Sequence, residues 1–205
     1  MSLGTKVIVI LSEAKNLNKG IMIKPIYLYG ADVLRRTAAP ADLNDKEGIA
    51  ALVQDLKDTL KVADGCGLAA PQIGVSLQVV IVDGDVVSDV YDYLKGFRRT
   101  IINPEIIDHS EEQVTYSEGC LSVPGIYCDI VRPKTITLRY YNEDLQEVTE
   151  TFDNFASRMI QHELSHLEGD LFTDHVAPIR KKMISGKLLN ISKGKVHPHY
   201  NSKLK

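Results

Sequence analysis

The string His162-Glu163-Leu164-Ser165-His166 constrains what this chain can fold into more than any other feature of its sequence. On a helix, a four-residue step places two imidazoles on one face, close enough to bind one metal ion, and the Glu after the first His can move protons at a metal-bound water. Apolar residues at helical spacing predict a helix from about Asp153 to Glu168, ended by Gly169. The sequence therefore predicts a metal-bearing helix; the alternative is a surface helix with two unrelated histidines.

A third ligand is needed, because catalytic sites of this kind usually have three protein ligands and one open position. Metzincins carry a third His at the position that Phe172 occupies here, and thermolysin-like enzymes use a downstream Glu, but no Glu follows Glu168. The residues alone leave several donors open, namely Asp170, Asp174 and His175 beyond the helix and Cys66, Cys120 and Cys128 before it.

The remaining hydrophobic patterning predicts an α+β fold. Apolar spacing predicts a long helix over Asn44–Asp64, with Asn44 as its N-cap and Gly65 as its stop, and a further helix near Pro178–Leu189. The predicted strands cluster between helices, which fits α+β better than α/β, and 205 residues fit one domain. These strands are Leu77–Val82, Thr100–Ile107, Gln113–Tyr116, Thr135–Tyr141 and Glu147–Phe152, the last two joined as an antiparallel hairpin.

Composition excludes several classes of protein. Lys and Arg number 24 against 27 Asp and Glu, so the net charge is −3 and no basic field is expected to hold nucleic acid in a sequence-specific way. Three cysteines are too few for a disulfide framework and favour a reducing compartment. No apolar run approaches the roughly 18 residues of a membrane span. We therefore expect a cytoplasmic protein without membrane contact.

The two ends of the chain differ from its middle. We expect residues 1–21 to be a leader or an extension added in cloning, with an edge strand at Lys6–Leu11 as the alternative. The catalytic domain is predicted over residues 22–190, and residues 191–205 are predicted to form a basic C-terminal tail without acidic residues. In that tail, His197 and His199 are expected to be unstructured.

Three segments together resemble the bacterial type of peptide deformylase, whose motifs are GxGLAAxQ, EGCLS and QHExDHLxG in that order. They lie here at residues 65–72, 118–122 and 161–169. The resemblance extends from about Met22 to His175 and implies a single domain of antiparallel or mixed β-sheets around a central metal-bearing helix. Ser165 departs from the family, which usually has Asp there, and we predict that the missing carboxylate would have met Arg132 or Arg158.

The resemblance also implies a role for each motif residue. Glu163 would be the general acid and base, while the Gln72 side-chain amide and the backbone N–H of Leu121 would stabilise the oxyanion. Gly67 would hold the substrate backbone. The implied metal ligands are Cys120, His162 and His166, and the candidates for the methionine pocket are Cys66, Tyr116, Tyr127 and Met159.

The implied reaction is hydrolysis of the N-formyl group from newly synthesised proteins that begin with formyl-methionine, releasing formate. One divalent metal is expected per chain, Fe(II) in the cell and Zn, Ni or Co as options in purified protein, since a thiolate with two imidazoles suits all four. The implied partners are N-formyl-methionyl nascent peptides and, through the basic tail, a transient contact with the ribosome. Two alternatives stay open: an HExxH metallopeptidase, which would need a third ligand other than Cys120, and a catalytically degenerate relative.

Overall fold

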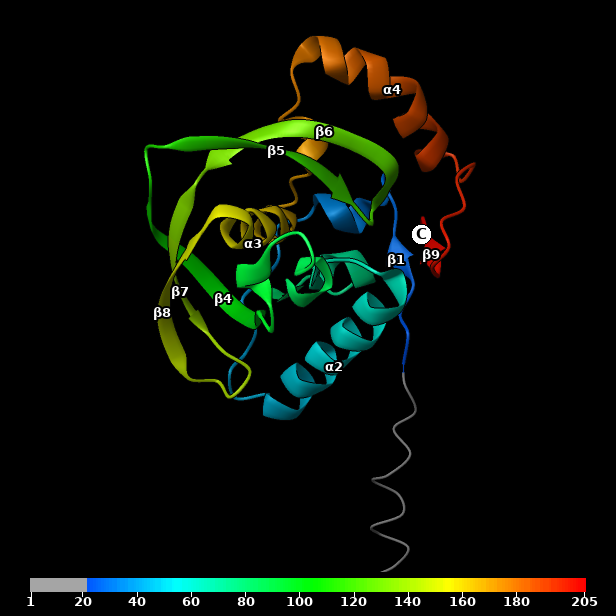
Figure 1. Ribbon diagram of the computed structural model, residues 1–205. Helices are drawn as coiled ribbons and strands as arrows, with labels where there is room; N and C mark the ends of the chain where they lie inside the picture. Colours follow the sequence, from blue (N-terminus) through cyan, green and yellow to red (C-terminus); the bar gives the residue numbers. More distant parts are fainter. Residues whose placement is uncertain (1–21) are drawn as a thin grey trace, which may run out of the picture.

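The computed structural model describes residues 22–205, so the predicted leader and the strand at Lys6–Leu11 lie outside the described residues. The described part has the expected α+β architecture, with mostly antiparallel sheets and three α-helices (Figure 1). Its strands are β1 (Ile26–Tyr27), β2 (Gly67–Ala69), β3 (Val79–Asp83), β4 (Arg98–His109), β5 (Gln113–Cys120), β6 (Val123–Pro133), β7 (Thr135–Tyr141), β8 (Glu147–Asp153) and β9 (Ser202–Lys203). Its α-helices are α2 (Lys46–Ala63), α3 (Asn154–Leu167) and α4 (Pro178–Ser192).

Five strands form one antiparallel sheet in the order β2-β3-β4-β7-β8. In β7, the side chains of Ile136, Leu138 and Tyr140 are buried and alternate with more exposed ones, as the sequence pattern predicts. The turn after β7 forms because the Asn142 side chain accepts hydrogen bonds from the backbone N–H groups two and four residues further on. The predicted hairpin of β7 and β8 is therefore confirmed.

A second antiparallel pair, β5 with β6, lies beside α3 (Figure 1). The sequence predicted β5 but not β6, because Pro124 and Gly125 at the start of β6 are typical of a turn. Beyond them, the side chains of Ile126, Cys128 and Ile130 are buried and alternate with exposed ones. This alternation is the pattern of a strand with one buried face, and it would have identified β6.

Helix α2 packs on β2 and β3 and confirms the first predicted helix. Both of its ends differ slightly from the prediction. The N-cap is Asp45 rather than Asn44, because the Asp45 carboxylate accepts a hydrogen bond from an N–H group of the first turn. The C-cap is Asp64, with a left-handed φ of 56°, rather than Gly65. The buried stripe of the helix contains the predicted residues Ile49, Leu52, Val53, Leu56 and Leu60.

Helix α3 is buried over most of its surface. It contacts β2, β3, β7 and β8 of the five-stranded sheet and β6 of the hairpin. Polar side chains are therefore buried together with apolar ones, and they include Ser157, Arg158, Gln161, His162, Glu163 and His166. Buried polar groups require hydrogen-bonding partners. The polar side chains of α3 therefore need partners from the surrounding strands, whereas those of a surface helix can bind water.

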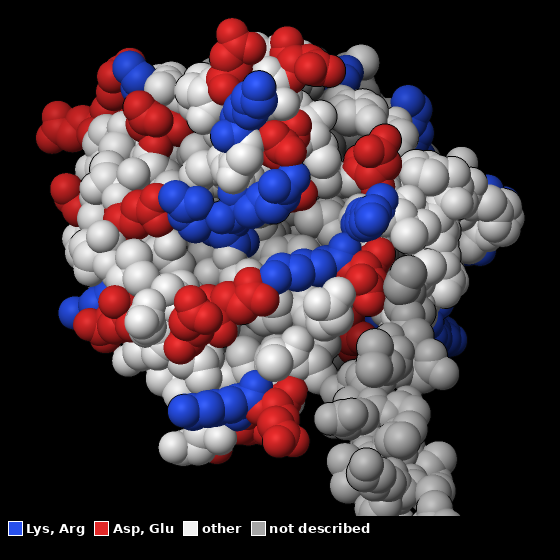
Figure 2. Space-filling view, turned by 60° about the horizontal axis from the view of Figure 1, so that its bottom comes forward, with Lys and Arg blue, Asp and Glu red and all other residues white. Residues whose placement is uncertain are grey.

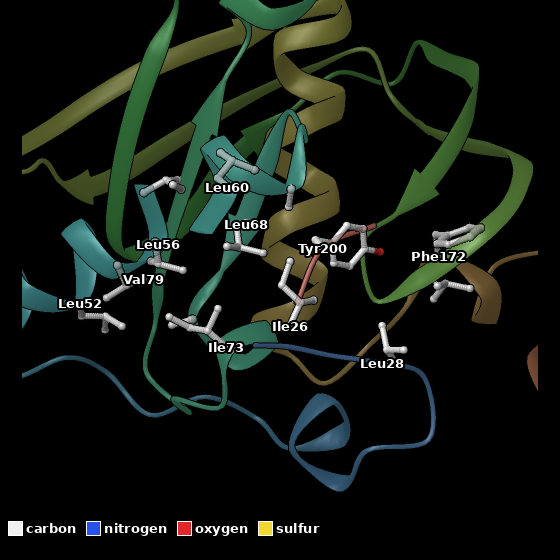
Figure 3. Packing of buried hydrophobic residues seen from close by; sticks show 14 of the residues in the cluster. Ile26, Leu28, Leu52, Leu56, Leu60, Leu68, Ile73, Val79, Phe172 and Tyr200 are labelled. Carbon is white, nitrogen blue, oxygen red and sulfur yellow. The ribbon is translucent and has the colours of Figure 1, made fainter. Parts of the chain in front are cut away.

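The C-terminal residues belong to the fold. Helix α4 continues to Ser192, past the predicted boundary at residue 190, and contacts β6. The chain then returns so that β9 pairs in parallel with β1. Tyr200 is buried in the main hydrophobic cluster, where Figure 3 shows it together with side chains of β1, α2 and β2. The prediction that His197 and His199 lie in an unstructured terminus is wrong, because Tyr200 and β9 anchor this segment.

Figure 2 shows basic and acidic side chains interspersed over one face of the protein. Ion pairs such as Lys57–Glu143 and Arg139–Glu105 join exposed groups of opposite charge. This mixture leaves no large basic field on that face, in agreement with the low net charge. Within residues 22–205, no helix combines the length and the apolar character that crossing a membrane would require.

Candidate metal centre

Three donor residues meet where the end of β5 approaches α3, and we call them the Cys-His-His group: Cys120, His162 and His166. The two histidines lie one turn apart on α3, and the cysteine is the last residue of β5. Cys120 Sγ lies 3.3 Å from His166 Nε2, and the candidate donor atoms of all three residues lie within 4.8 Å of one another. The structure thus brings together the three residues that the resemblance implied as ligands.

The other donors that the sequence left open have different partners. Asp174 forms an ion pair with Arg35, and His175 pairs with Asp170. Cys128 is buried in the hydrophobic cluster, as the predicted role of a small apolar residue requires. These side chains therefore take no part in the Cys-His-His group.

The turn between β5 and β6 directs the Cys120 sulfur toward α3. The strand register shifts between Glu118 and Cys120, and such a bulge redirects the side chains around it. Gly119 occupies the irregular position because a Cβ atom there would come within 2.5 Å of the Tyr127 ring. The backbone N–H of Ser122 donates to Cys120 Sγ at 3.4 Å and holds the sulfur in place.

Glu118 orients His162. The carboxylate Oε2 lies 2.8 Å from His162 Nδ1, so Nδ1 carries a proton and Nε2 is left to bind a metal. Burial lowers the pKa of His162, but hydrogen bonds to Cys120 and Glu118 outweigh it and raise the pKa to about 10. By contrast, burial and the charge of His162 hold the pKa of His166 well below its ordinary value.

Two arginines complete the cluster around Glu118, an arrangement that no sequence motif indicated. Arg132 Nε and Arg158 Nη1 donate to Glu118 Oε1 at 2.8 and 2.6 Å. Arg158 also donates to one backbone carbonyl in each of β5 and β6. Burial would raise the pKa of Glu118, but hydrogen bonds from His162 and Arg132 outweigh it and hold the pKa well below its ordinary value. Glu118 is therefore ionised.

Ser165 contacts one of the two cations that were predicted to face it. Arg132 Nη1 donates to Ser165 Oγ at 2.9 Å, whereas Arg158 binds Glu118 and the backbone. The serine hydroxyl thus accepts a hydrogen bond from the guanidinium that an aspartate at this position would meet.

Glu163 is buried beside the Cys-His-His group. Its exposed fraction is 5%, and no described residue makes a hydrogen bond to its Oε2 atom. Gly67 makes room for this carboxylate, because a Cβ atom there would lie 2.6 Å from Glu163 Oε1. Burial raises the pKa of Glu163 to about 7. A group with a pKa near neutrality can both accept and donate a proton.

Gln72 approaches the group from the segment between β2 and β3. The backbone N–H of Ala69 donates to its Oε1 at 2.8 Å, which fixes the orientation of the amide. Its Nε2 lies 3.1 Å from Ser122 Oγ and 3.5 Å from Cys120 Sγ. A buried N–H donor held in this way is suited to stabilising negative charge.

A cleft of about 720 Å³ opens beside Glu163 and His162. Burial raises the pKa of Cys66 to about 11, so its thiol contributes an uncharged wall. Four of the five predicted substrate-binding residues line the cleft, namely Cys66, Gly67, Tyr127 and Met159. The lining also includes residues that the sequence did not single out, among them Pro124, Gly125, Ile126, Phe155 and the segment Val196–Tyr200.

Tyr116, the fifth predicted residue, is not part of this lining. Its ring packs edge-on against Phe155, with 5.5 Å between the ring centroids, and lies 5.1 Å from the Arg158 guanidinium. Tyr116 lies on the same face of β5 as Glu118, but four residues before Cys120 and so further from the Cys-His-His group. Phe155 occupies the wall that Tyr116 was expected to form.

Comparison with known proteins identifies the family of this chain. The chain matches the model of the polypeptide deformylase family over residues 23–182. It is 39% identical over 182 residues to the peptide deformylase of Cytophaga hutchinsonii, which covers 89% of this chain and 97% of that protein. It is 42% identical over 192 residues to the peptide deformylase of Flavobacterium johnsoniae, with 89% and 96% covered.

The fold agrees as well. The crystal structure of a peptide deformylase from Legionella pneumophila superposes with a TM-score of 0.74 and 34% identity, covering 84% of this chain and 97% of that one. The matched family region includes all three motif segments and the whole Cys-His-His group. The chain therefore belongs to the polypeptide deformylase family.

Proposed function

We propose that Cys120, His162 and His166 hold the divalent metal on which this family's hydrolysis depends. The observation that carries the proposal is the approach of one sulfur and two imidazoles to within 4.8 Å. The His162 Nδ1–H group donates to Glu118, which is the support that ligating imidazoles usually have. A thiolate with two imidazoles suits Fe(II), Zn, Ni or Co, and we expect Fe(II) in the cell.

As a peptide deformylase, the enzyme removes the N-formyl group from proteins that begin with formyl-methionine and releases formate. Held by Cys120, His162 and His166, a divalent metal would supply Lewis-acid chemistry, making water more acidic and the formyl group more electrophilic. Glu163 takes the proton of the attacking water and gives it to the leaving amine, a role worth about 10²–10⁴ in rate. Two properties of Glu163 support this role. None of the described residues makes a hydrogen bond to its Oε2 atom, and its pKa is about 7.

Two N–H donors stabilise the oxyanion that develops from the formyl group. One is the Gln72 side-chain amide, which is fixed by Ala69 and points toward Cys120 and Ser122. The other is the backbone N–H of Leu121, in the turn between β5 and β6. Loss of one such donor costs on the order of 10²–10³ in rate.

The substrate lies in the cleft with its methionine side chain against apolar walls. Cys66, Phe155 and Met159 supply these walls, and Gly67 supplies backbone groups. Gly67 belongs to β2, which is the outermost strand of the five-stranded sheet, so an extended peptide can pair with its free edge.

Substrate chains emerge from the ribosome, so we place the reaction in the cytoplasm. No acidic residue follows Asp174, while Lys residues recur through α4 and beyond it. A segment of this composition is suited to a transient contact with the phosphate backbone of ribosomal RNA.

The test of the site is formate release from formyl-Met-Ala by protein loaded anaerobically with Fe(II) or Ni(II). We expect Glu163→Gln to lower kcat by at least about 10² while the protein keeps its metal. Glu168→Gln is the matched control, because Glu168 lies exposed at the end of the same helix and should leave kcat unchanged. Cys120→Ala should abolish stoichiometric metal, whereas Cys128→Ala should not.

Three outcomes would contradict the proposal. Cleavage of unformylated peptides by the loaded enzyme, with formyl-Met-Ala untouched, would favour the metallopeptidase alternative. A full metal content without any turnover would favour the degenerate alternative. One tightly bound metal in the Cys120→Ala variant would overturn the choice of third ligand.

A further inference from the structure

The segment Val196–Tyr200 forms part of the cleft wall, although it follows the last motif of the family by more than twenty residues. Along this segment, the exposed side chains of His197 and His199 alternate with the more buried Val196, Pro198 and Tyr200. The parallel pairing of β9 with β1 holds the segment on its C-terminal side, and α4 holds it on the other. The segment Val196–Tyr200 is therefore held in place as one wall of the active-site cleft.

Tyr200 joins this wall to the metal centre. Its side chain is buried, and its hydroxyl donates a hydrogen bond to the carbonyl oxygen of Leu121. That carbonyl and the N–H of Ser122 belong to the same peptide group, and this N–H donates to Cys120 Sγ at 3.4 Å. One peptide group therefore connects the Tyr200 hydroxyl with the sulfur of a candidate metal ligand.

A second contact holds the same turn from the other end of the described chain. The backbone N–H of Tyr29 donates to the carbonyl oxygen of Ser122 at 2.7 Å. Gln72 Nε2 also contacts Ser122, at its Oγ atom. The turn Cys120–Ser122 is thus fixed from several sides, and Tyr200 is the contribution of the C-terminal segment.

We propose that the C-terminal segment completes the active site in two ways. Tyr200 is a positioning residue that fixes the Leu121–Ser122 peptide, and with it the Cys120 sulfur and the Leu121 N–H group. His197 and His199 contact the part of the peptide substrate that lies beyond its second residue. The first part rests on the proposed roles of Cys120 and Leu121, whereas the second rests only on the lining of the cleft.

The variant Tyr200→Phe keeps the ring and removes only the hydroxyl. In Co(II)-loaded protein, we expect it to move the thiolate-to-metal absorption band of Cys120 and to lower kcat by about 10- to 100-fold with little change in KM, the range typical of residues that support metal ligands. Tyr140→Phe is the matched control, because Tyr140 is also buried but donates to Glu150 in the sheet. It should change neither the band nor kcat.

An unchanged absorption band and an unchanged kcat in Tyr200→Phe would overturn the positioning role. A loss of melting temperature equal to that of Tyr140→Phe, with the band in place, would also overturn it, because the hydroxyl would then act on stability alone. The absorption band needs no turnover, so this test is separate from the failure of the proposed function. If the band persists in Cys120→Ala, the ligand assignment fails and the role of Tyr200 fails with it.

Substrate length tests the second role. The double variant His197→Ala/His199→Ala should raise KM for formyl-Met-Ala-Ser by about 2- to 10-fold, as expected for one lost hydrogen bond, and leave KM for formyl-Met-Ala unchanged. His175→Ala is the control, because His175 is an exposed histidine outside the cleft lining. Equal KM changes for both peptides, or no change for either, would overturn the contact with later substrate residues.

Discussion

Two sets of ion pairs in this enzyme have similar chemistry and very different surroundings. Around Glu118, Arg158 and Arg132 bind a carboxylate whose side chain is 3% exposed. On the sheet, Arg139 binds Glu105, and these side chains are 49% and 59% exposed. Exposed pairs contribute about 0–1 kcal/mol, whereas breaking a buried pair costs about 3–5 kcal/mol because a charge is left without a partner. Position, more than contact distance, therefore decides what an ion pair contributes.

The buried ion pairs around Glu118 are also the ones that contact a candidate metal ligand. Glu118 accepts hydrogen bonds from both arginines and from His162 at once. Well-packed apolar side chains could replace a buried ion pair without loss of stability, so stability alone gives no reason for it. We interpret the cluster as the support that fixes the His162 ring, and the pairs on the sheet as ordinary surface charges.

The variant Glu118→Gln should produce the largest difference between the two sets. It leaves the buried guanidinium of Arg158 and the largely buried one of Arg132 with a neutral partner, so we expect the free energy of unfolding to fall by about 3–5 kcal/mol. Metal affinity should fall by about 10- to 100-fold, because the His162 ring loses its anionic acceptor. Denaturant unfolding and competition with a chelator measure the two effects.

Glu112→Gln is the matched control for this prediction. Glu112 lies just before the same strand and binds Lys134, but its side chain is 62% exposed. It should change stability by less than about 1 kcal/mol and leave metal affinity unchanged. Equal effects of the two variants would show that burial does not separate the two sets.

Glu150 provides an intermediate case, with a side chain that is 29% exposed. It accepts hydrogen bonds from Arg99 at 2.6 and 2.9 Å and from the Tyr140 hydroxyl at 2.9 Å. We expect Glu150→Gln to lower the free energy of unfolding by about 1.5 kcal/mol, between the effects at Glu118 and Glu105. A loss as large as that of Glu118→Gln in denaturant unfolding would contradict this order.

The same carboxylate predicts a dependence on pH. The hydrogen bond from Arg99 holds the pKa of Glu150 below its ordinary value, although burial opposes it. A carboxyl group whose pKa is lowered by folding contributes stability above the ordinary pKa of about 4.3, and this contribution is lost as the pH falls through the folded-state pKa. Unfolding free energies measured between pH 6 and pH 3 should therefore fall more steeply in the unmodified protein than in Glu150→Gln. Parallel curves would show that Glu150 does not contribute to the loss.

A smaller effect is expected at Ser165, where the buried cluster departs from the family. Arg132 donates to the serine hydroxyl, so an aspartate there would meet the same guanidinium. We expect Ser165→Asp to raise the free energy of unfolding by about 1 kcal/mol, with kcat/KM retained, because a charged acceptor strengthens the hydrogen bond. The idea would be wrong if neither the melting temperature nor kcat/KM changed.

The smallest effect is expected at Glu105. Its partner Arg139 is half exposed, so water solvates both groups once the pair is broken. We expect Glu105→Gln to change the free energy of unfolding by less than about 0.5 kcal/mol, and to shift it less still at high salt. A change above 2 kcal/mol would show that exposure is a poor guide to the energy of these pairs.

Local sequence patterns predicted those parts of the fold that depend on neighbouring residues. Helical spacing identified α2 and α3, and strict alternation identified β7 with the turn at Asn142. Strand β6 was missed, because Pro124 and Gly125 at its start favour a turn when they are considered without their partner strand. Beyond them, the alternation of buried and exposed residues indicates a strand, and its pairing with β5 extends this strand back to Val123.

The candidate site also has residues that local motifs identified and residues that depend on contacts between distant segments. The motifs identified the Cys-His-His group, Glu163 and Gln72, and the structure brings their side chains together. The partners of Glu118 could not be predicted, because nothing in the local sequence shows that Arg132 and Arg158 are buried. Val196–Tyr200 was missed as well, since its place in the cleft depends on pairing between strands that lie far apart in the chain.

The pairing of β1 with β9 has a consequence for the order in which the enzyme is made. A ribosome synthesises β1 long before β9, and all residues of the Cys-His-His group emerge before α4. A growing chain that ends within α4 therefore contains every candidate metal ligand but lacks the Tyr200 contact and one wall of its cleft. Since contacts between distant segments form only after both have been synthesised, the active site is completed only once β9 has followed α4.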